Sequence, residues 1–170
     1  MFRFMNRSID LLEELAEESG NYFKFNRRGY LYCTAQEDAP ERFQREALSF
    51  AQLTGSPLRV HTGCGNEMPY APVQTEGYRN QPDGVDLLLD PILIQEYFPF
   101  LTKDIKAALH VRRAGWMSAQ QLGMYLLEQA RENGVQLIIG KVCGIQTSGG
   151  KVSGVRLEDG SEIGTKIFIN

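Results

Sequence analysis

The fold of this chain is decided by its last third, residues 115–170, which read GWMSAQQLGMYLLEQARENGVQLIIGKVCGIQTSGGKVSGVRLEDGSEIGTKIFIN. Apolar residues recur there at helical spacing, at Leu122, Leu126 and Ala130. Ser118 and Gln121 stand before this run with the spacing of a capping box, in which two side chains satisfy free backbone N–H groups. The pattern predicts a helix that begins near Ser118 and ends at Asn133-Gly134.

Strands are predicted after this helix. Residues 135–139, VQLII, form a short apolar run that suits a strand buried on both faces. A meander with tight turns at Ser148-Gly149-Gly150 and Asp159-Gly160 follows. It leads into an apolar strand over residues 167–169, and because no polar tail follows, we expect the chain to stop inside that strand.

Helices and strands also alternate in the first part of the chain. Apolar spacing predicts a helix over residues 8–19, which Gly20 ends. The β-rich runs 22–25 and 29–34 flank residues 26–29, which we interpret as a hairpin turn. Asp38 and Pro40 then open a second helix that ends at Gly55 and Pro57.

Periodicity is lost in the middle of the chain. A short strand is expected at Leu58 and Val60, but residues 62–90 are rich in glycine, proline and asparagine and predict a long loop or insertion. Loops of this length are usually functional or mobile. A short helix over residues 92–97 and a strand over 107–111 follow.

Composition excludes several classes of protein. The 170 residues carry 18 Lys and Arg against 21 Asp and Glu, so no basic excess exists for nucleic acid. No apolar run has the length of a membrane span, and the N-terminal residues lack the features of a signal peptide. Three widely spaced cysteines, Cys33, Cys64 and Cys143, favour a reducing compartment. We therefore expect a cytoplasmic protein that binds no nucleic acid and does not span a membrane.

Taken in order, these motifs resemble the FAD-dependent oxidoreductases of the D-amino acid oxidase type, which include sarcosine oxidase and glycine oxidase. The resemblance lies in Gly115-Trp116 before the helix, Gly134-Val135 at its end, Val142-Cys143-Gly144-Ile145, the run from Gly150 to Val155, and Asp159-Gly160. It covers the last third well and the first two thirds only through the order of elements. Residues 62–90 depart from the family pattern.

The resemblance implies a mixed α/β fold in which a substrate-binding domain of sheet and helices is inserted into the FAD-binding domain. Residues 1–114 would then belong to the inserted domain, with a loop insertion at 62–90. Residues 115–170 would be a helix, strand and meander of the FAD-binding domain. The implied activity is oxidation of the C–N bond of a small amine or amino acid, with hydride transfer to FAD.

This chain lacks the glycine-rich turn that cradles a dinucleotide pyrophosphate. We therefore expect a fragment that is inactive alone and binds FAD weakly or not at all. Its apolar runs 135–139 and 166–170 predict self-association. Two other interpretations stay open: a non-catalytic module that binds a small ligand or partner, and a subunit completed by a separate nucleotide-binding chain.

One cofactor-binding residue follows from the resemblance. The residue that matches Val142 lends its backbone amide and carbonyl to the adenine of FAD; the alternative is an ordinary buried strand residue. The catalytic residues stay unknown. Gly63-x-Gly65 is not a dinucleotide fingerprint, because Met68 replaces the third glycine and Pro69 and Pro72 exclude the helix that should follow.

The remaining candidates have structural interpretations. His61 and Cys64 have the spacing of two metal ligands. A structural zinc site needs four ligands, however, and the other His and Cys residues lie far apart in the sequence, which argues against a metal site. His110, in an apolar strand, suits a hydrogen-bonded structural histidine. Four tyrosines could line a substrate pocket, but packing in the sheet (Tyr30 and Tyr32) and in the loop (Tyr70 and Tyr78) is the favoured interpretation. Arg27-Arg28 suits a carboxylate, or else a solvated turn.

Overall fold

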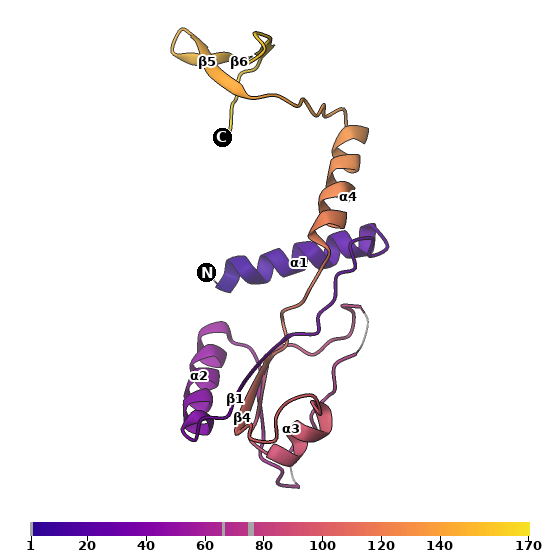
Figure 1. The fold of residues 1–170 in the computed structure, drawn as a ribbon, viewed down its shortest axis with the longest axis vertical. Coiled ribbons are helices and arrows are strands. Elements are labelled where there is room, and N and C mark those ends of the chain that lie inside the picture. Colours follow the sequence, from indigo (N-terminus) through magenta and orange to yellow (C-terminus); the bar gives the residue numbers. More distant parts are fainter. Residues whose placement is uncertain (1, 66, 75–76) are drawn as a thin grey trace. The chain divides into compact units, whose positions relative to one another are not determined.

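The computed structural model describes residues 2–65, 67–74 and 77–170. The chain divides into two compact units, Met1–Leu126 and Leu127–Asn170, and each is described here by itself. Both helices and sheets are present, which confirms the mixed α/β class (Figure 1). The expected assignment of residues 1–114 and 115–170 to two functional domains stays a prediction.

A four-stranded sheet forms the centre of the first unit. Its strands, in chain order, are β1 (Tyr30–Thr34), β2 (Leu58–His61), β3 (Val85–Leu88) and β4 (Ala107–Val111). Their spatial order is β1-β4-β3-β2, with β2 parallel to β3 and the other neighbours antiparallel. The helices α2 and α3 lie on opposite sides of this sheet (Figure 1).

Helix α2 (Ala39–Thr54) forms where the capping signals predict it. Pro40 occupies its first turn, and Gly55, with φ 67°, donates its N–H to the carbonyl of Ala51 at 2.8 Å. Glycine is favoured at this left-handed position because it has no Cβ. The buried face of the helix packs on one side of the sheet, through Ala39 and Phe43 against Leu87 and Ala107.

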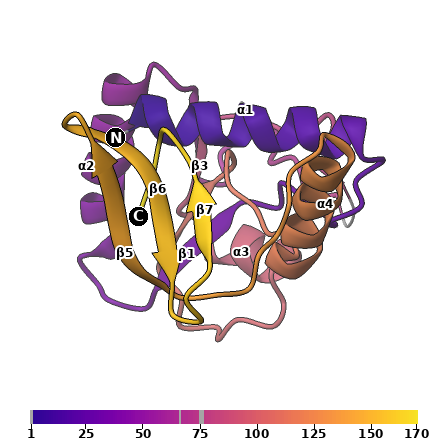
Figure 2. The ribbon, with the colours of Figure 1, turned by 90° about the horizontal axis from the view of Figure 1, so that it is seen from above.

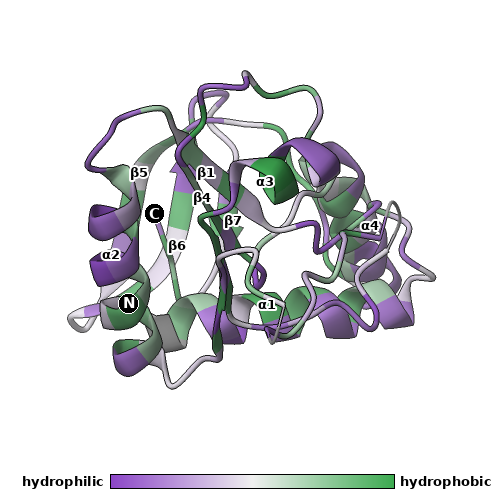
Figure 3. Ribbon diagram, turned by 90° about the horizontal axis from the view of Figure 1, so that it is seen from below, coloured by the Kyte–Doolittle hydropathy of each residue, from purple (hydrophilic) through white to green (hydrophobic). Residues whose placement is uncertain are grey.

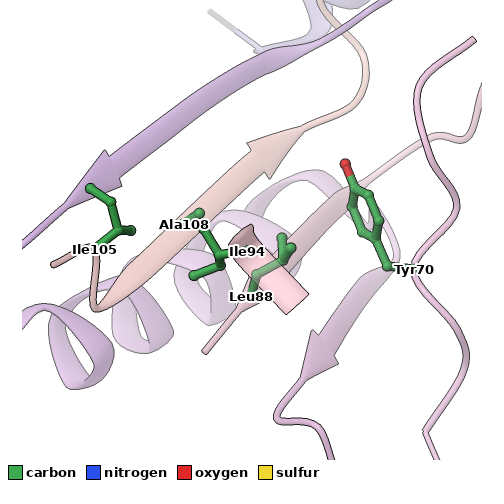
Figure 4. Close-up of a cluster of buried hydrophobic side chains, with 5 residues drawn as sticks. All are labelled: Tyr70, Leu88, Ile94, Ile105 and Ala108. Atoms are coloured by element: carbon green, nitrogen blue, oxygen red, sulfur yellow. The ribbon is translucent and has the colours of Figure 1, made fainter. Parts of the chain in front are cut away.

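Helix α3 (Pro91–Tyr97) covers the other side of the sheet. The buried cluster there consists of Tyr70, Leu88, Ile94, Ile105 and Ala108 (Figure 4). The prediction of a loop over 62–90 is wrong at its C-terminal end, because residues 85–88 form β3 and are all buried. Apolar layers on both faces explain this burial. The strand was not predicted from the sequence because the charged Asp86 interrupts its apolar run.

Helix α1 (Phe2–Glu18) is longer than the predicted 8–19. Hydrophobic and hydrophilic segments alternate along its ribbon (Figure 3), and its apolar face, which includes Ala16, packs on Phe23, Phe25 and Tyr78. Within the described residues, no helix combines the length and apolar character of a membrane span.

The predicted hairpin at residues 26–29 is wrong. Residues 22–25 form no strand, and β1 pairs with β4 instead. Asn21 and Lys24, both with φ 58°, turn the chain away from an extended path. Phe23 and Phe25 both enter the cluster that packs on α1.

Helix α4 (Ala119–Glu132) crosses the division between the units, and the Ser118 Oγ accepts a hydrogen bond from the Gln121 N–H at 3.3 Å. The second unit contains the predicted meander, whose strands are β5 (Val142–Ser148), β6 (Lys151–Leu157) and β7 (Glu162–Gly164). They pair in the order β5-β6-β7 and are antiparallel (Figure 2).

The strands predicted over 135–139 and 167–169 do not form. Ile139 is 95% exposed and Ile169 is 88% exposed. A strand requires a neighbour for its backbone N–H and C=O groups, and neither segment has one among the described residues. Apolar sequence alone therefore did not suffice to form them.

Candidate functional site

A hollow of about 890 Å³ lies between the loop that follows α1 and the start of β1. Lys24 and Arg28 bring positive charge to its lining, and Tyr30 and Trp116 bring aromatic rings. No described residue of the lining is acidic. We call this feature, defined by Lys24, Arg28, Tyr30 and Trp116, the cationic hollow. Its composition suits a small anionic ligand with an apolar part.

The loop that carries Lys24 is held by a side-chain clamp. The Asn21 Oδ1 accepts a hydrogen bond from the Phe25 N–H at 2.8 Å, and the Asn21 Nδ2 donates to the Phe25 carbonyl at 2.9 Å. Inside this clamp Lys24 has a φ of 58°, a conformation that costs a non-glycine residue about 1–2 kcal/mol. The loop thus holds the lysine in an unfavourable backbone conformation at the edge of the hollow, as residues at binding sites often are.

None of the ion pairs found among the described residues involves Lys24. Several other basic side chains of this unit are paired: Arg27 with Glu13 and Asp83, Arg79 with Glu17, and Arg113 with Asp10. The ammonium of Lys24 is therefore the group of the hollow best placed to form an ion pair with a negatively charged group of a ligand.

Gly115 brings the two walls of the hollow together. Asn26 and Trp116 form an isolated bridge, with the Asn26 N–H donating to the Trp116 carbonyl at 2.9 Å and the Trp116 N–H donating back at 3.2 Å. A Cβ on Gly115 would overlap the Asn26 carbonyl oxygen. Beside this bridge Trp116 is 62% exposed and Tyr30 is 54% exposed, which leaves both rings open to a ligand.

A second, mostly apolar pocket of about 440 Å³ adjoins the hollow beneath α1. The two share the residues Phe25, Tyr30, Gly115 and Trp116, and Ile9 and Leu12 of α1 extend the apolar lining. A ligand could therefore keep a charged end at Lys24 and place an apolar end in this pocket.

A buried ionic cluster lies deeper in the sheet. The carboxylate of Asp86, which is 0% exposed, accepts hydrogen bonds from Arg59 at 2.6 Å and from Arg112, and lies 2.9 Å from the His61 Nε2. Burial by itself raises the pKa of Asp86, but the hydrogen bonds from Arg59, His61 and Arg112 outweigh it and lower that pKa to about 2. Asp86 is therefore ionised and paired.

Tyr70 and His110 connect this cluster to the hollow. The Tyr70 ring lies 4.6 Å from the Arg112 guanidinium carbon, and its hydroxyl lies 2.9 Å from the His110 Nδ1. The His110 Nε2 lies 2.8 Å from the carbonyl oxygen of Arg28. Burial and then repulsion from Arg112 lower the pKa of His110 to about 4, so this imidazole is neutral near pH 7.

His110 is thus a buried, hydrogen-bonded histidine, as the sequence predicted. Tyr30 and Tyr32 are residues of β1, and Tyr70 and Tyr78 pack in the core. The interpretation of Arg27 as part of a solvated turn is wrong: it is 7% exposed and pairs with Glu13 and Asp83. With its partners supplied by α1 and the 62–84 loop, Arg27 is a structural ion-pair residue.

The other candidates lie apart from the hollow. The Nε2 of His61 contacts Asp86, and Cys64 is exposed. Among the described residues, no group of three or more His, Cys, Asp or Glu side chains is arranged to hold a metal ion. Gly63 packs closely against the side chain of Asp90 in a segment without a following phosphate-binding helix.

Val142 begins the edge strand β5. The Lys141 carbonyl accepts from the Glu158 N–H at 2.9 Å, and Val142 lies opposite Leu157. In an antiparallel ladder the bonding direction alternates, so the N–H and C=O of Val142 point away from β6, toward the open edge of the sheet. Val142 thereby presents one donor and one acceptor side by side.

The sequence did not single out Lys24, Trp116 or Asp86 as site residues. Gly20-Asn21 after a helix was a usable signal for the left-handed turn that carries Lys24. Gly115-Trp116 was recognised only as a family motif. Asp86 inside the apolar run VDLLL signalled a buried ion pair, since an unpaired carboxylate is not buried there.

The chain matches one family model and is similar to proteins of known structure. The family model of FAD-dependent oxidoreductases (DAO) matches residues 1–170. The fold is similar to that of glycine oxidase from Bacillus cereus ATCC 14579, with a TM-score of 0.66 and 19% identity over 96% of this chain and 38% of the other. It is also similar to L-proline dehydrogenase from P. horikoshii, with a TM-score of 0.64 and 21% identity over 97% and 36%.

No curated protein matches the chain. The chain spans less than two fifths of the length of these two solved structures, which both share its arrangement of helices and sheets. The family model covers every residue of the chain, including the first two thirds, which carry only the order of elements. The chain belongs to the family of FAD-dependent oxidoreductases of the D-amino acid oxidase type.

Proposed function

We propose that this chain is part of an enzyme that oxidises the C–N bond of a small amino acid, and that the cationic hollow receives the substrate carboxylate. The observation that carries the proposal is the hollow itself: Lys24 and Arg28 line it beside two exposed aromatic rings, with no acidic residue in the described lining. The two similar structures are, by their names, a glycine oxidase and an L-proline dehydrogenase, which supports an amino acid as substrate.

Each lining group has a role in this proposal. Lys24 donates a charge-assisted hydrogen bond to the carboxylate. Trp116 and Tyr30 pack against the carbon skeleton and exclude water from one side of it. FAD, when bound, supplies the hydride acceptor for the oxidation.

The described residues fit one end of that cofactor. The N–H and C=O of Val142 point to the open edge of β5, which is the donor and acceptor pair that an adenine edge requires. We propose that the backbone of residues 141–145 contacts the adenine. No glycine-rich strand-to-helix turn that would bind the pyrophosphate occurs in this sequence.

The function is tested with the flavin-loaded full-length enzyme of which this chain is part, under anaerobic conditions. Glycine, sarcosine and L-proline are added in turn, and reduction of the flavin is followed by its loss of absorbance. We expect at least one of them to reduce the flavin faster than its partner without a carboxylate, methylamine, dimethylamine or pyrrolidine respectively. Equal rates for both members of every pair, or no reduction by any, would contradict the proposal. Binding without reduction would favour the non-catalytic module.

Lys24→Met is expected to raise the KM of the amino acid about tenfold, because it removes one charge-assisted hydrogen bond to the carboxylate. The KM of the matched amine is expected to stay unchanged. Steady-state kinetics with both compounds measure the difference. Lys103→Met, an exposed lysine beyond α3, is the control and should alter neither value. An unchanged KM in Lys24→Met would show that this lysine does not bind the substrate carboxylate.

Val142→Pro is expected to weaken FAD binding roughly tenfold to a hundredfold, because proline has no N–H to donate to adenine and leaves an acceptor unpaired. Fluorescence titration of the full-length apoenzyme with FAD measures the change. The fold should survive, since the lost N–H points away from β6. Val142→Ala should bind like the parent, because the contact is made by the backbone.

Val152→Pro is the matched control, because Val152 lies in the central strand β6. Proline there removes a bond of the ladder or distorts it, so the control should lower stability before it affects FAD specifically. A folded Val142→Pro that holds FAD as tightly as the parent would show that this residue does not contact adenine.

A further inference from the structure

We propose that His110 is a positioning residue for the cationic hollow: held in place by Tyr70, it donates to the carbonyl of Arg28 and so holds the main chain of Arg28 and Gly29 against β4. The inference rests on the proposed function, since it concerns the same hollow. Neither His110 nor Tyr70 lines the hollow. Both act through the backbone that does.

The tautomer of His110 follows from its two partners. A carbonyl oxygen only accepts hydrogen bonds, so the Nε2, 2.8 Å from the Arg28 carbonyl, carries the proton and donates. The Nδ1 is then unprotonated and accepts from the Tyr70 hydroxyl at 2.9 Å. Because His110 is 2% exposed, water does not substitute for either partner.

Tyr70 is itself held by the buried ionic cluster. Its ring packs against the guanidinium of Arg112, which donates to Asp86 and, at 2.7 Å, to the carbonyl of Ala71. A continuous line of contacts therefore runs from Asp86 through Arg112, Tyr70 and His110 to the main chain at the edge of the hollow. Such supporting partners fix the position of groups that contact a ligand.

Gly29 allows the main chain to lie directly on the imidazole. Its φ is 81°, and a Cβ would overlap the His110 Nε2 and approach the Val111 carbonyl oxygen. Arg28 and Gly29 line the cationic hollow on one side and, together with His110, a pocket of about 390 Å³ on the other. The segment thus lines two pockets, and His110 lines only the second of them.

Two substitutions separate positioning from simple packing. His110→Phe keeps a planar ring but removes the donor, and His110→Gln keeps an N–H that reaches the Arg28 carbonyl. In the flavin-loaded enzyme we expect His110→Phe to raise the KM of the amino acid about tenfold with kcat within about twofold. His110→Gln should restore the KM to within about twofold of the parent. The KM of the amine that lacks a carboxylate should not change in either.

A purely structural role would lower the melting temperature of both variants without separating the two substrates. A folded His110→Phe whose amino acid KM equals that of the parent overturns the inference. If His110→Phe does not fold, Tyr70→Phe replaces it, because this change removes only the hydroxyl that holds the imidazole in place. Its expected effect is about a threefold rise in the amino acid KM, and an unchanged KM overturns the inference.

Lys24→Met distinguishes a failure of the inference about His110 from a failure of the proposed function. If Lys24→Met leaves the amino acid KM unchanged, the hollow does not bind the carboxylate and the proposed function fails at this site. If Lys24→Met raises the KM while folded His110→Phe does not, the hollow stands and the positioning role of His110 is wrong.

Discussion

Asp86→Asn is expected to lower the free energy of unfolding by about 3–5 kcal/mol, the largest effect that we expect from a single substitution in this chain. Asp86 is fully buried, and its carboxylate faces the cations of Arg59 and Arg112. Asparagine keeps the size of the side chain but removes the negative charge. It thereby leaves Arg112, which is 2% exposed, as a buried cation without a counter-charge.

Chemical denaturation of the parent and the variant measures this difference. Glu14→Gln is the control, since the pair of Glu14 with Arg7 is exposed and should contribute no more than about 0.5 kcal/mol. If Asp86→Asn were as stable as the parent, the buried pairs would not be required for folding.

The pH dependence of the free energy of unfolding is a second measurement of the contribution of Asp86. The pKa of Asp86 falls from 3.8 to about 2 on folding, so the folded state binds fewer protons than the unfolded state between these values. The stabilisation is fully present above pH 4 and is lost as the pH falls through 2. Asp86→Asn should therefore flatten the acid side of the stability profile of the parent.

Gly115→Ala is expected to lower the free energy of unfolding by about 2–3 kcal/mol and to disrupt the cationic hollow as well. A Cβ at this position overlaps the Asn26 carbonyl oxygen, which is backbone and has no alternative rotamer. The Asn26–Trp116 bridge must then open, and Trp116 moves with it. Thermal unfolding and the KM of the amino acid measure the two effects.

Gly123→Ala in α4 is the matched control, because a Cβ there meets no atom within 4 Å. Alanine inside a helix should raise stability by about 0.5–1 kcal/mol. A variant Gly115→Ala with the melting temperature and KM of the parent would mean that the close approach of the two walls is not needed.

Local signals in the sequence determined several elements within a few residues. Asp38, Pro40 and Gly55 delimited α2, and the run LHV lay in β4 as predicted. Gly149-Gly150 and Asp159-Gly160 placed the turns of the meander. These signals succeed because capping and tight turns depend on backbone conformations that only neighbouring residues control.

Burial and pairing partners were not determined locally. The run VQLII has the composition of a buried strand, yet residues 135–139 are not a strand, because no described neighbour completes their hydrogen bonds. The run 85–88, which contains an aspartate, is a buried strand because Arg59 of β2 and Arg112, directly after β4, neutralise the aspartate.

The sequence predicted less of the cationic hollow than of the helices and strands. The family motif drew attention to Gly115-Trp116, and the resemblance supplied FAD and Val142. Lys24 joined the site only through the tertiary structure, where a left-handed turn after α1 brings it beside residues that lie about ninety positions later in the sequence. By itself the sequence determined the family and the elements with local signals; only the tertiary structure decided which side chains share one space, because that depends on long-range packing and not on neighbours in the chain.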